Sequence, residues 1–453
     1  MKRSIMNITK SITPIVGMVV FAGLTQEAQA MPMFTAQTGM DCAGCHTQHM
    51  PRLNKLGRKF AASGMTISKI VSDMDRDDTG LFSDTDINPS MLIKSKYNKT
   101  YDKPNGKGAI DTSDGSTNEG EFSPIRMASI FLGGRLSENV GAILKLGHRE
   151  EEGESIGGKA VYAHAMDDDQ TYVGAVFFST ASLGPFSGME FYNTGLYKPL
   201  RMFDMKIYNN TVQKQKIGSQ AATGLQVYYD RDGLFDDEDH FFVTAGVYTP
   251  AQDSLYYDMT DNLIPFARVA YEYMYSDYNF IFGGFVMSGG DIVADTSPLS
   301  IKRETYGIDL QIEGEVMDRE VTFAATKVFK NDVEYSGINS AVDEYDTESM
   351  YDEGFSVQAA VSMTDAIIGK VSYMHYNDTN EYRSDNLNGT TAPSDTTKVN
   401  VKDLDYAIGL GVDYGFVVTG TAMKLAVEYA WMEPSLERVE KFENFMVTFT
   451  LPF

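Results

Sequence analysis

Apolar and polar residues alternate with a period of two through most of the chain after residue 88. One such run alternates Leu404, Tyr406, Ile408, Leu410, Val412 and Tyr414 with Asp405, Ala407, Gly409, Gly411 and Asp413. Further runs at 267–275, 424–431 and 444–453 follow the same rule. This period predicts β-strands with one apolar face and one face of small or charged side chains. We therefore expect residues 89–453 to form an all-β domain.

The connections between these runs distinguish a soluble β-sandwich from a barrel in a membrane. Short turns at 137–139, 276–278, 317–319 and near 364–365 interleave with long polar segments at 99–121, 181–220, 330–352 and 377–400. One rim of short turns and one rim of long loops is the layout of outer-membrane barrels. A closed barrel also satisfies every backbone polar group in lipid, which an open sandwich does not. The count of runs predicts a transmembrane antiparallel β-barrel of about 16 strands, with extracellular long loops and both barrel ends at the periplasm.

The first 30 residues have the features of an export signal peptide. Lys2, Arg3 and Lys10 are basic, residues 12–24 are mostly apolar, and small residues follow at 28–30. The apolar run is shorter than the ~20 residues that a membrane-spanning helix needs. We expect residues 1–30 to be removed during export to the bacterial outer membrane, where lipid would surround the barrel.

The chain is strongly acidic. Its formal net charge is -25, and removal of residues 1–30, with three basic residues and one acidic residue, leaves -27. This charge makes nucleic acid an improbable partner and favours cations, such as metal ions or basic soluble cytochromes. The alternative explanation is that the acidity solubilises the long loops.

Both cysteines of the chain stand in the run Cys42-Ala43-Gly44-Cys45-His46. A Cys-x-x-Cys-His run is the attachment site of a c-type haem, in which both thiols form thioethers and the histidine binds the iron. A redox dithiol, a structural disulfide and half a zinc site are the alternatives. Zinc needs a second ligand pair that the sequence lacks, and a redox dithiol has no need of His46. We predict one covalent haem c on Cys42 and Cys45, with His46 on the iron.

Residues 31–70 are predicted to form a small haem domain. Apolar and ring-bearing positions recur at helical spacing, which predicts a short helix that runs on from the haem site. These positions are His49, Met50, Leu53, Leu56 and Phe60. The other face of this helix is basic, with Arg52, Lys55, Arg58 and Lys59. A domain this small buries little surface alone, so we expect the haem and a surrounding wall to complete its core.

The second axial ligand of the iron is left open by the sequence. His49 lies three residues after His46, so on one helix the two share a face and do not reach opposite sides of one ring. Met65 is far enough along the chain to loop over the distal face, where a thioether raises the redox potential. Met50 is a further candidate. A barrel residue, a water molecule or an open position is also compatible with the pattern.

The haem segment resembles a known family. Phe34–Gly39, Cys42–His46, Leu53–Asn54, Gly57–Phe60 and Gly64 are similar to the haem domain of the outer-membrane fused cytochrome–porins of iron-oxidising bacteria. The chain departs from the family pattern at Thr35-Ala36, Leu56, Ala61 and Met65. That family joins a monohaem cytochrome c to a porin-like barrel. The resemblance therefore implies a role in taking electrons from extracellular ferrous iron.

Together these features predict an outer-membrane cytochrome. The acidic residues 71–88 are expected to link the haem domain to the periplasmic mouth, so that the domain plugs the lumen. Its basic face would meet inward acids, namely Glu272, Asp309, Glu313, Asp405 and Glu428. Single electrons would pass from an extracellular donor, such as ferrous iron, to the haem and then to a soluble periplasmic cytochrome. The alternatives are a solute-conducting porin with a structural or sensing haem, and outward electron delivery to an extracellular acceptor.

Other polar residues carry weaker expectations. Strand parity predicts that His164 points into the lumen, whereas His148, His240 and His375 are expected at interfaces or in turns. Among the acidic clusters, Glu150–Glu152 lies on the long-loop side and is a better iron-docking candidate than Asp167–Asp169 and Asp236–Asp239, which fall in short turns. The sequence shows no catalytic triad or nucleotide-binding glycine loop, so redox chemistry is the reaction we expect.

Overall fold

The structure is a computed structural model of the 453-residue chain. It describes residues 32–48, 52–67, 85–101, 120–149, 153–166, 170–180, 189, 202–205, 222–236, 238–249, 263–289, 300–336, 349–378, 404–418, 421–434 and 442–452. The predicted signal peptide, His49, Met50 and the acidic clusters at 150–152 and 167–169 lie outside these ranges.

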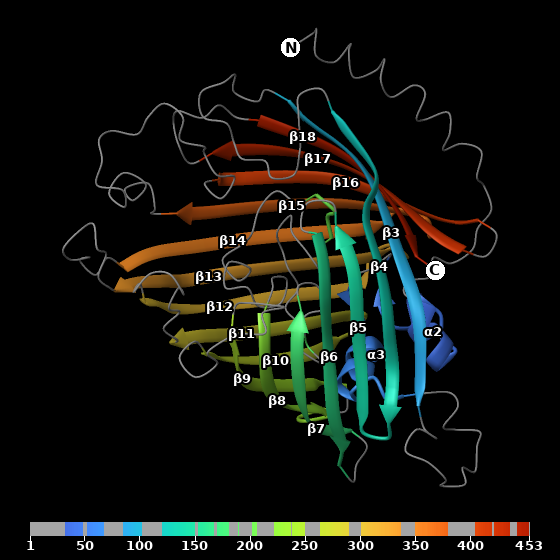
Figure 1. The fold of residues 1–453 in the computed structure, drawn as a ribbon, viewed down its shortest axis with the longest axis vertical. Coiled ribbons are helices and arrows are strands. Elements are labelled where there is room, and N and C mark those ends of the chain that lie inside the picture. Colours follow the sequence, from blue (N-terminus) through green and yellow to red (C-terminus); the bar gives the residue numbers. More distant parts are fainter. Residues whose placement is uncertain are drawn as a thin grey trace.

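Sixteen antiparallel strands form one closed barrel, as the alternation predicted. Each strand pairs with its neighbours in the sequence, and β18 pairs with β3 to close the ring (Figure 1). The strands are β3 (Asp86–Tyr101), β4 (Glu121–Ser137), β5 (Val140–Arg149), β6 (Gly153–Ala165), β7 (Thr171–Thr180), β8 (Ala222–Asp232), β9 (His240–Thr249), β10 (Ile264–Tyr275), β11 (Tyr278–Gly289), β12 (Ser300–Glu315), β13 (Glu320–Ser336), β14 (Ser349–Ser362), β15 (Ile367–Asp378), β16 (Leu404–Val418), β17 (Thr421–Pro434) and β18 (Phe442–Pro452).

Side chains along the strands alternate between a buried inner face and an exposed outer face. In β10, Arg268 and Glu272 are buried inside the barrel, whereas Val269 and Tyr273 are exposed outside it. Exposed apolar side chains recur around the outer face, at Leu144, Leu146, Phe177, Val227, Phe282, Ile308 and Leu410. The outer face is therefore an apolar belt, and the closed ring leaves no strand edge unpaired.

The two ends of the barrel differ in the length of their connections. We call one of them the short-turn end, and it carries the connections β4–β5, β6–β7, β8–β9, β10–β11, β12–β13, β14–β15 and β16–β17. Several connections at the opposite, long-loop end are much longer, and the one between β7 and β8 spans residues 181–221. The barrel begins at Asp86 rather than at residue 89, so the predicted linker is shorter at its C-terminal side. Residues 71–84 of that linker lie outside the described ranges.

The N-terminal unit, residues 32–48 and 52–67, lies inside the barrel at its short-turn end. It comprises α2 (Pro32–Thr38), the 3-10 turn η1 (Cys42–Gly44), the short strands β1 (His46–Thr47) and β2 (Arg52–Leu53), and α3 (Lys55–Ala62). In Figure 1 both helices, drawn in blue, lie near the end of the barrel where the C-terminus is marked. Among the described residues, no helix is long and apolar enough to cross a membrane.

The helix predicted over 49–60 is wrong at its N-terminal half. Arg52 lies on β2, where it pairs with Thr47, and α3 starts only at Lys55. One feature of the sequence explains the late start: Asn54 is a favourable N-cap, whose side chain accepts a hydrogen bond from the Gly57 amide.

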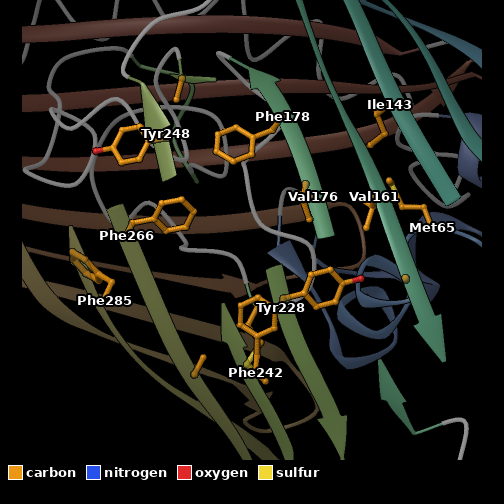
Figure 2. Close-up of a cluster of buried hydrophobic side chains, with 14 of the residues drawn as sticks. Met65, Ile143, Val161, Val176, Phe178, Tyr228, Phe242, Tyr248, Phe266 and Phe285 are labelled. Carbon is orange, nitrogen blue, oxygen red and sulfur yellow. The ribbon is translucent and has the colours of Figure 1, made fainter. Parts of the chain in front are cut away.

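The inner wall of the barrel carries an apolar cluster on one side, together with buried charged residues such as Arg268 and Glu272. Buried apolar side chains line β4 to β11, and Figure 2 shows Val161, Val176, Tyr228 and Phe242 from four neighbouring strands, with Met65 of the N-terminal unit beside Val161. The opposite side carries buried polar residues, including Gln358, Ser372, Asp413, Glu428, Thr448 and Asn98. An apolar inner wall is unusual for a water-filled lumen, and here it packs against protein: Met33, Phe60 and Met65 belong to the same cluster.

Candidate haem site

His46 is held on a two-stranded hairpin by a hydrogen bond across it. β1 and β2 pair antiparallel, with His46 opposite Leu53. The Nδ1 atom of His46 lies 3.2 Å from the carbonyl oxygen of Arg52. A neutral imidazole that donates from Nδ1 has its lone pair on Nε2, which is how metal-binding histidines are commonly oriented. A hydrogen bond that His46 donates from Nδ1 across the hairpin would therefore leave the lone pair of its ring on Nε2.

The cysteine turn is fastened to the start of α3. Asn54 donates from its side-chain amide to the carbonyl oxygens of Ala43 and Gly44, at 3.3 Å and 3.1 Å, and from its backbone to that of Cys45 at 3.0 Å. A Cβ on Gly57 would lie 2.1 Å from the Cys45 carbonyl oxygen, so only glycine fits there. Cys45 is half-buried and Ala43 is exposed. The turn is thus rigidly supported on one side and accessible on the other; the side chain of Cys42 lies outside what the structure describes.

Arg58 joins the N-terminal unit to the barrel wall through two carboxylates. Its Nε and Nη2 atoms donate to Glu272 at 2.9 Å and 2.7 Å, and its Nη1 atom donates to Glu313 at 3.0 Å. The side chains of Arg58 and Glu272 are fully buried. A guanidinium that binds a carboxylate with two parallel hydrogen bonds fixes orientation as well as charge. Arg58 therefore sets how α3 sits in the lumen.

The same network extends along the wall to His240. The Nδ1 atom of His240 lies 3.3 Å from Glu272, and its Nε2 atom lies 2.8 Å from Asp230. Both ring nitrogens face carboxylate oxygens, and both donate only in the imidazolium form. Sequence reasoning placed His240 at an interface or turn, and this was wrong: its side chain is 1% exposed. The local sequence around His240 does not predict these contacts, because the two carboxylates lie on β8 and β10, the strands that flank β9.

Two lysines of α3 add contacts at the rim. The Nζ atom of Lys59 lies 2.9 Å from Asp232, and that of Lys55 donates to the Glu238 carbonyl oxygen at 2.7 Å. Burial lowers the pKa of Lys59, but its hydrogen bond and attraction to Asp232 outweigh burial, so the net effect raises that pKa. Both contacts lie at the short-turn end of the barrel.

The predicted pairing of the basic face with inward acids is confirmed for two of the five acids. Glu272 and Glu313 bind Arg58. Asp309 instead pairs with Arg268, and Glu428 with Lys370, both within the barrel. The side chain of Asp405 lies outside the described residues.

Glycines in the barrel wall form a smooth seat for the N-terminal unit. A Cβ on Gly141 would lie 2.0 Å from the carbonyl oxygen of Gly64, and a Cβ on Gly134 would lie 2.9 Å from the side chain of Gln37. Gly133 lies against Met33 in the same way, with a 3.0 Å approach to the sulfur. Larger residues on β4 and β5 would push the unit out of the lumen. The sequence did not predict this glycine-lined seat, because a glycine in a strand also occurs at bulges and tight bends.

Of the three distal-ligand candidates, only Met65 lies among the described residues. It is 3% exposed and has a left-handed backbone, with φ of 60°. Its side chain packs beside Val161 on the barrel wall (Figure 2), and Gln37 donates to its carbonyl oxygen at 2.8 Å. Ligation of the iron by Met65, His49 or Met50 stays a prediction.

His164 points outward, which contradicts the prediction from strand parity. It is exposed, whereas Val161 and Ala163 on the same strand are buried inside. The rule that apolar residues face lipid fails on β6, because the lumen beside it is filled with protein instead of water.

The acidic turn at 236–239 has a structural role. The carboxylate of Asp239 accepts hydrogen bonds from the backbone amides of Leu234 and Phe235, at 2.6 Å and 2.8 Å, and from the Tyr271 hydroxyl at 2.9 Å. Burial raises the pKa of Asp239, but these hydrogen bonds outweigh it and lower that pKa overall. Within the described ranges, no group of three or more histidine, cysteine, aspartate or glutamate side chains is placed to hold a metal ion.

A second piece of chain is anchored inside the lumen. Residues 202–205 belong to the connection between β7 and β8, which the sequence predicted as an external loop. The amides of Asp204 and Met205 each donate to Glu428 at 2.7 Å, and Lys370 donates to the Met202 carbonyl oxygen at 2.8 Å. Part of this connection therefore lies inside the lumen, beside β15 and β17.

No family model and no curated protein matches this chain. Its fold is similar to solved outer-membrane proteins. The outer membrane channel DcaP of Acinetobacter baumannii is 12% identical, with a TM-score of 0.45, over 81% of this chain and 96% of that one. OmpF of Salmonella typhi, in complex with daunomycin, is 10% identical, with a TM-score of 0.48, over 81% of this chain and 97% of that one. OprB of Pseudomonas putida is 10% identical, with a TM-score of 0.47, over 81% and 94%.

Proposed function

We propose that this protein is an outer-membrane β-barrel that holds one haem c at its short-turn mouth and exchanges single electrons there with a periplasmic carrier. The observation that carries the proposal is the support of the Cys-x-x-Cys-His run. His46 is oriented through Nδ1 by a backbone carbonyl, and the unit that bears the run is anchored to the wall by buried ion pairs. A rigid, oriented histidine next to two cysteines is suited to a bound redox centre.

The residues present fit a haem c. The cysteines at 42 and 45 would form the two thioethers, and the Nε2 atom of His46 would bind the iron. When bound, the haem supplies a one-electron ferric/ferrous couple. The chain itself supplies the orientation of His46, the fixed turn against Gly57 and an exposed side at Ala43. A partner approaching the short-turn mouth would meet that exposed side.

The outer membrane is the location that suits the barrel. Its outer face carries apolar side chains around the ring, and such a face is stable only in contact with lipid or a partner protein. A closed ring is also the one β-architecture that leaves no unpaired backbone group in a bilayer. We place the short turns at the periplasm and the long loops outside, as in other outer-membrane barrels.

The position of the unit limits how an external donor reaches it. Its contacts, such as those with Asp232, Glu313 and Glu320, lie in the short-turn half of the barrel. The apolar band of such barrels is about 25 Å tall, so a donor bound at the outer loops would be too far from the site. We infer that the extracellular donor is small enough to enter the lumen. Ferrous iron meets this requirement, and the acidic chain attracts it.

The test uses the purified full-length protein in detergent. Covalent haem is measured by mass spectrometry and by the spectrum of its pyridine adduct, with Cys42→Ala/Cys45→Ala as the control that should lack it. The ferric protein is then mixed anaerobically with ferrous iron at neutral pH. The appearance of the ferrous spectrum supports electron uptake. A wild-type protein without covalent haem would refute the proposal, and a haem that ferrous iron does not reduce would refute this donor.

A solute-conducting porin is the second candidate function. Sixteen-stranded barrels are wide enough to leave an aqueous channel. In this role the haem would only stabilise the unit or act as a sensor. Conductance in a planar bilayer separates the two functions: a porin conducts ions steadily whether or not Cys42 and Cys45 are present, whereas a plugged electron-transfer barrel conducts little.

A further inference from the structure

We infer that Arg52 is a positioning residue through which the barrel wall fixes the orientation of His46 and thereby sets the redox potential of the haem. The inference rests on the proposed function, because it assigns a role to Arg52 toward the bound haem. It starts from the fact that two groups of Arg52 face in different directions. Its carbonyl oxygen bonds the histidine ring, and its guanidinium bonds the barrel.

The guanidinium of Arg52 connects two strands of the wall. Its Nη2 atom donates to the side-chain oxygen of Gln311 on β12 and to the carbonyl oxygen of Phe323 on β13, each at 3.2 Å. Arg52 is 2% exposed. A planar fork holds two acceptors in fixed directions, which a flexible ammonium group does not do. The backbone of β2 is therefore tied to β12 and β13 at the residue whose carbonyl touches His46.

The other strand of the hairpin is tied to the same wall. The backbone amide of Gln48 donates to the Glu320 carboxylate at 3.1 Å, and its side-chain amide donates to the Glu320 carbonyl oxygen at 3.2 Å. The Thr322 hydroxyl donates to the side-chain oxygen of Gln48 at 3.0 Å. Gln48 also has a left-handed backbone, with φ of 56°, and non-glycine residues hold this conformation mainly where surrounding contacts impose it. Arg52 on β2 is thus held by β12 and β13, and Gln48, directly after β1, is held by β13.

This arrangement gives the wall influence over the iron. A hydrogen bond from Nδ1 to a carbonyl makes the imidazole a stronger electron donor, which stabilises ferric iron and lowers the potential. If the β2 backbone moves away from the ring, this bond weakens and the potential rises. The Arg52 side chain does not touch the iron, so its effect depends on the carbonyl that it holds in place.

The experiment compares haem potentials in purified full-length variants. In Arg52→Met, the loss of both wall contacts should raise the midpoint potential by about 59 mV, the equivalent of a tenfold change in a one-electron equilibrium, which is the lower end of effects from residues that orient metal ligands. Arg52→Lys should give a smaller rise. Gln311→Met removes one acceptor from the barrel side and should shift the potential in the same direction. Lys55→Met is the matched control, because Lys55 also binds the wall but not the hairpin.

Spectroscopy separates positioning from a general loss of packing. Resonance Raman spectra of the ferrous protein should show a weaker iron–histidine bond in Arg52→Met and an unchanged bond in Lys55→Met. An Arg52→Met haem with wild-type potential and wild-type iron–histidine bond would overturn this inference and leave the proposed function intact. Equal shifts in Arg52→Met and Lys55→Met would also overturn it. A wild-type protein that binds no covalent haem would instead refute the proposed function.

Discussion

The N-terminal unit should loosen sharply when Arg58 is replaced, because two buried carboxylates would lose their cation. Arg58→Met keeps most of the side-chain volume but removes the guanidinium that binds Glu272 at 2.7 Å and Glu313 at 3.0 Å. Glu272 would keep His240 and Asn279 as partners. Glu313 would keep only a weak contact to Asn279, at 3.4 Å, among the hydrogen bonds described for its side chain.

The size of the effect follows from the cost of an uncompensated buried charge. Removing one partner of a buried ion pair typically costs about 3–5 kcal/mol. The side chains concerned are at most 9% exposed, so solvent screening reduces this figure little. About 1.4 kcal/mol corresponds to a factor of ten in an equilibrium, and 3 kcal/mol therefore increases the undocked fraction of the unit more than a hundredfold. The barrel itself should stay folded, because Arg58 belongs to α3 of the N-terminal unit and to none of the sixteen strands.

Hydrogen exchange measures this change directly. Backbone amides of α3 should exchange with deuterium at least a hundredfold faster in Arg58→Met than in the wild type, while amides in β14 to β17 should not change. Adding Glu272→Gln and Glu313→Gln to Arg58→Met removes the orphaned charges, and most of the protection should return. Wild-type exchange in Arg58→Met, or no recovery in the triple variant, would show that the ion pair does not hold the unit in place.

Three further changes test other parts of the structure. Gly141→Ala places a Cβ 2.0 Å from the Gly64 carbonyl oxygen, in the turn after α3, and should undock the N-terminal unit. The amides of α3 should then exchange faster. Gly284→Ala, whose Cβ would have its nearest neighbour at 3.9 Å, should leave their exchange unchanged. Because the pKa of Asp239 is lowered, its carboxylate stabilises the turn fully at neutral pH, and this stabilisation is lost as the pH falls through that pKa. The backbone amides that the carboxylate binds should then exchange faster. Asp239→Asn should remove this pH dependence. Glu428→Leu should free residues 202–205, seen as at least a tenfold faster exchange of their two bonded amides. Unchanged rates would contradict each assignment.

Strand number and turn positions were predictable because each strand shows its own alternation. The turns near 138, 277, 318 and 365 all lie between strands, and the predicted count matches the sixteen strands observed. Local patterns of this kind need no knowledge of distant residues. The boundary at Asp86 was missed by three residues, because the acidic composition of the linker continues into β3.

The inner wall was predictable only where it is polar. Glu272 and Glu313 were recognised as inward acids that meet the basic face of the N-terminal unit, since an acid on an otherwise apolar strand stands out. His164 was misplaced because the assignment assumed a wet lumen, whereas the N-terminal unit fills the lumen beside β5 to β13. His240 was misplaced because its partners, Asp230 and Glu272, lie on the neighbouring strands β8 and β10. The contents of a barrel cannot be read from the alternation of its strands.

The closing pair of strands bears on how the molecule is assembled. Val447 on β18 pairs with Tyr97 on β3, and the next strand along from β3 carries part of the glycine seat. A ring that closed while empty would enclose the Glu272 and Glu313 carboxylates without the cation that neutralises them. We therefore expect the last two strands to join around a unit that is already folded. Under the proposed function, thioether formation on Cys42 and Cys45 would then precede insertion, and a cell unable to attach haem would accumulate unfinished barrels in the periplasm.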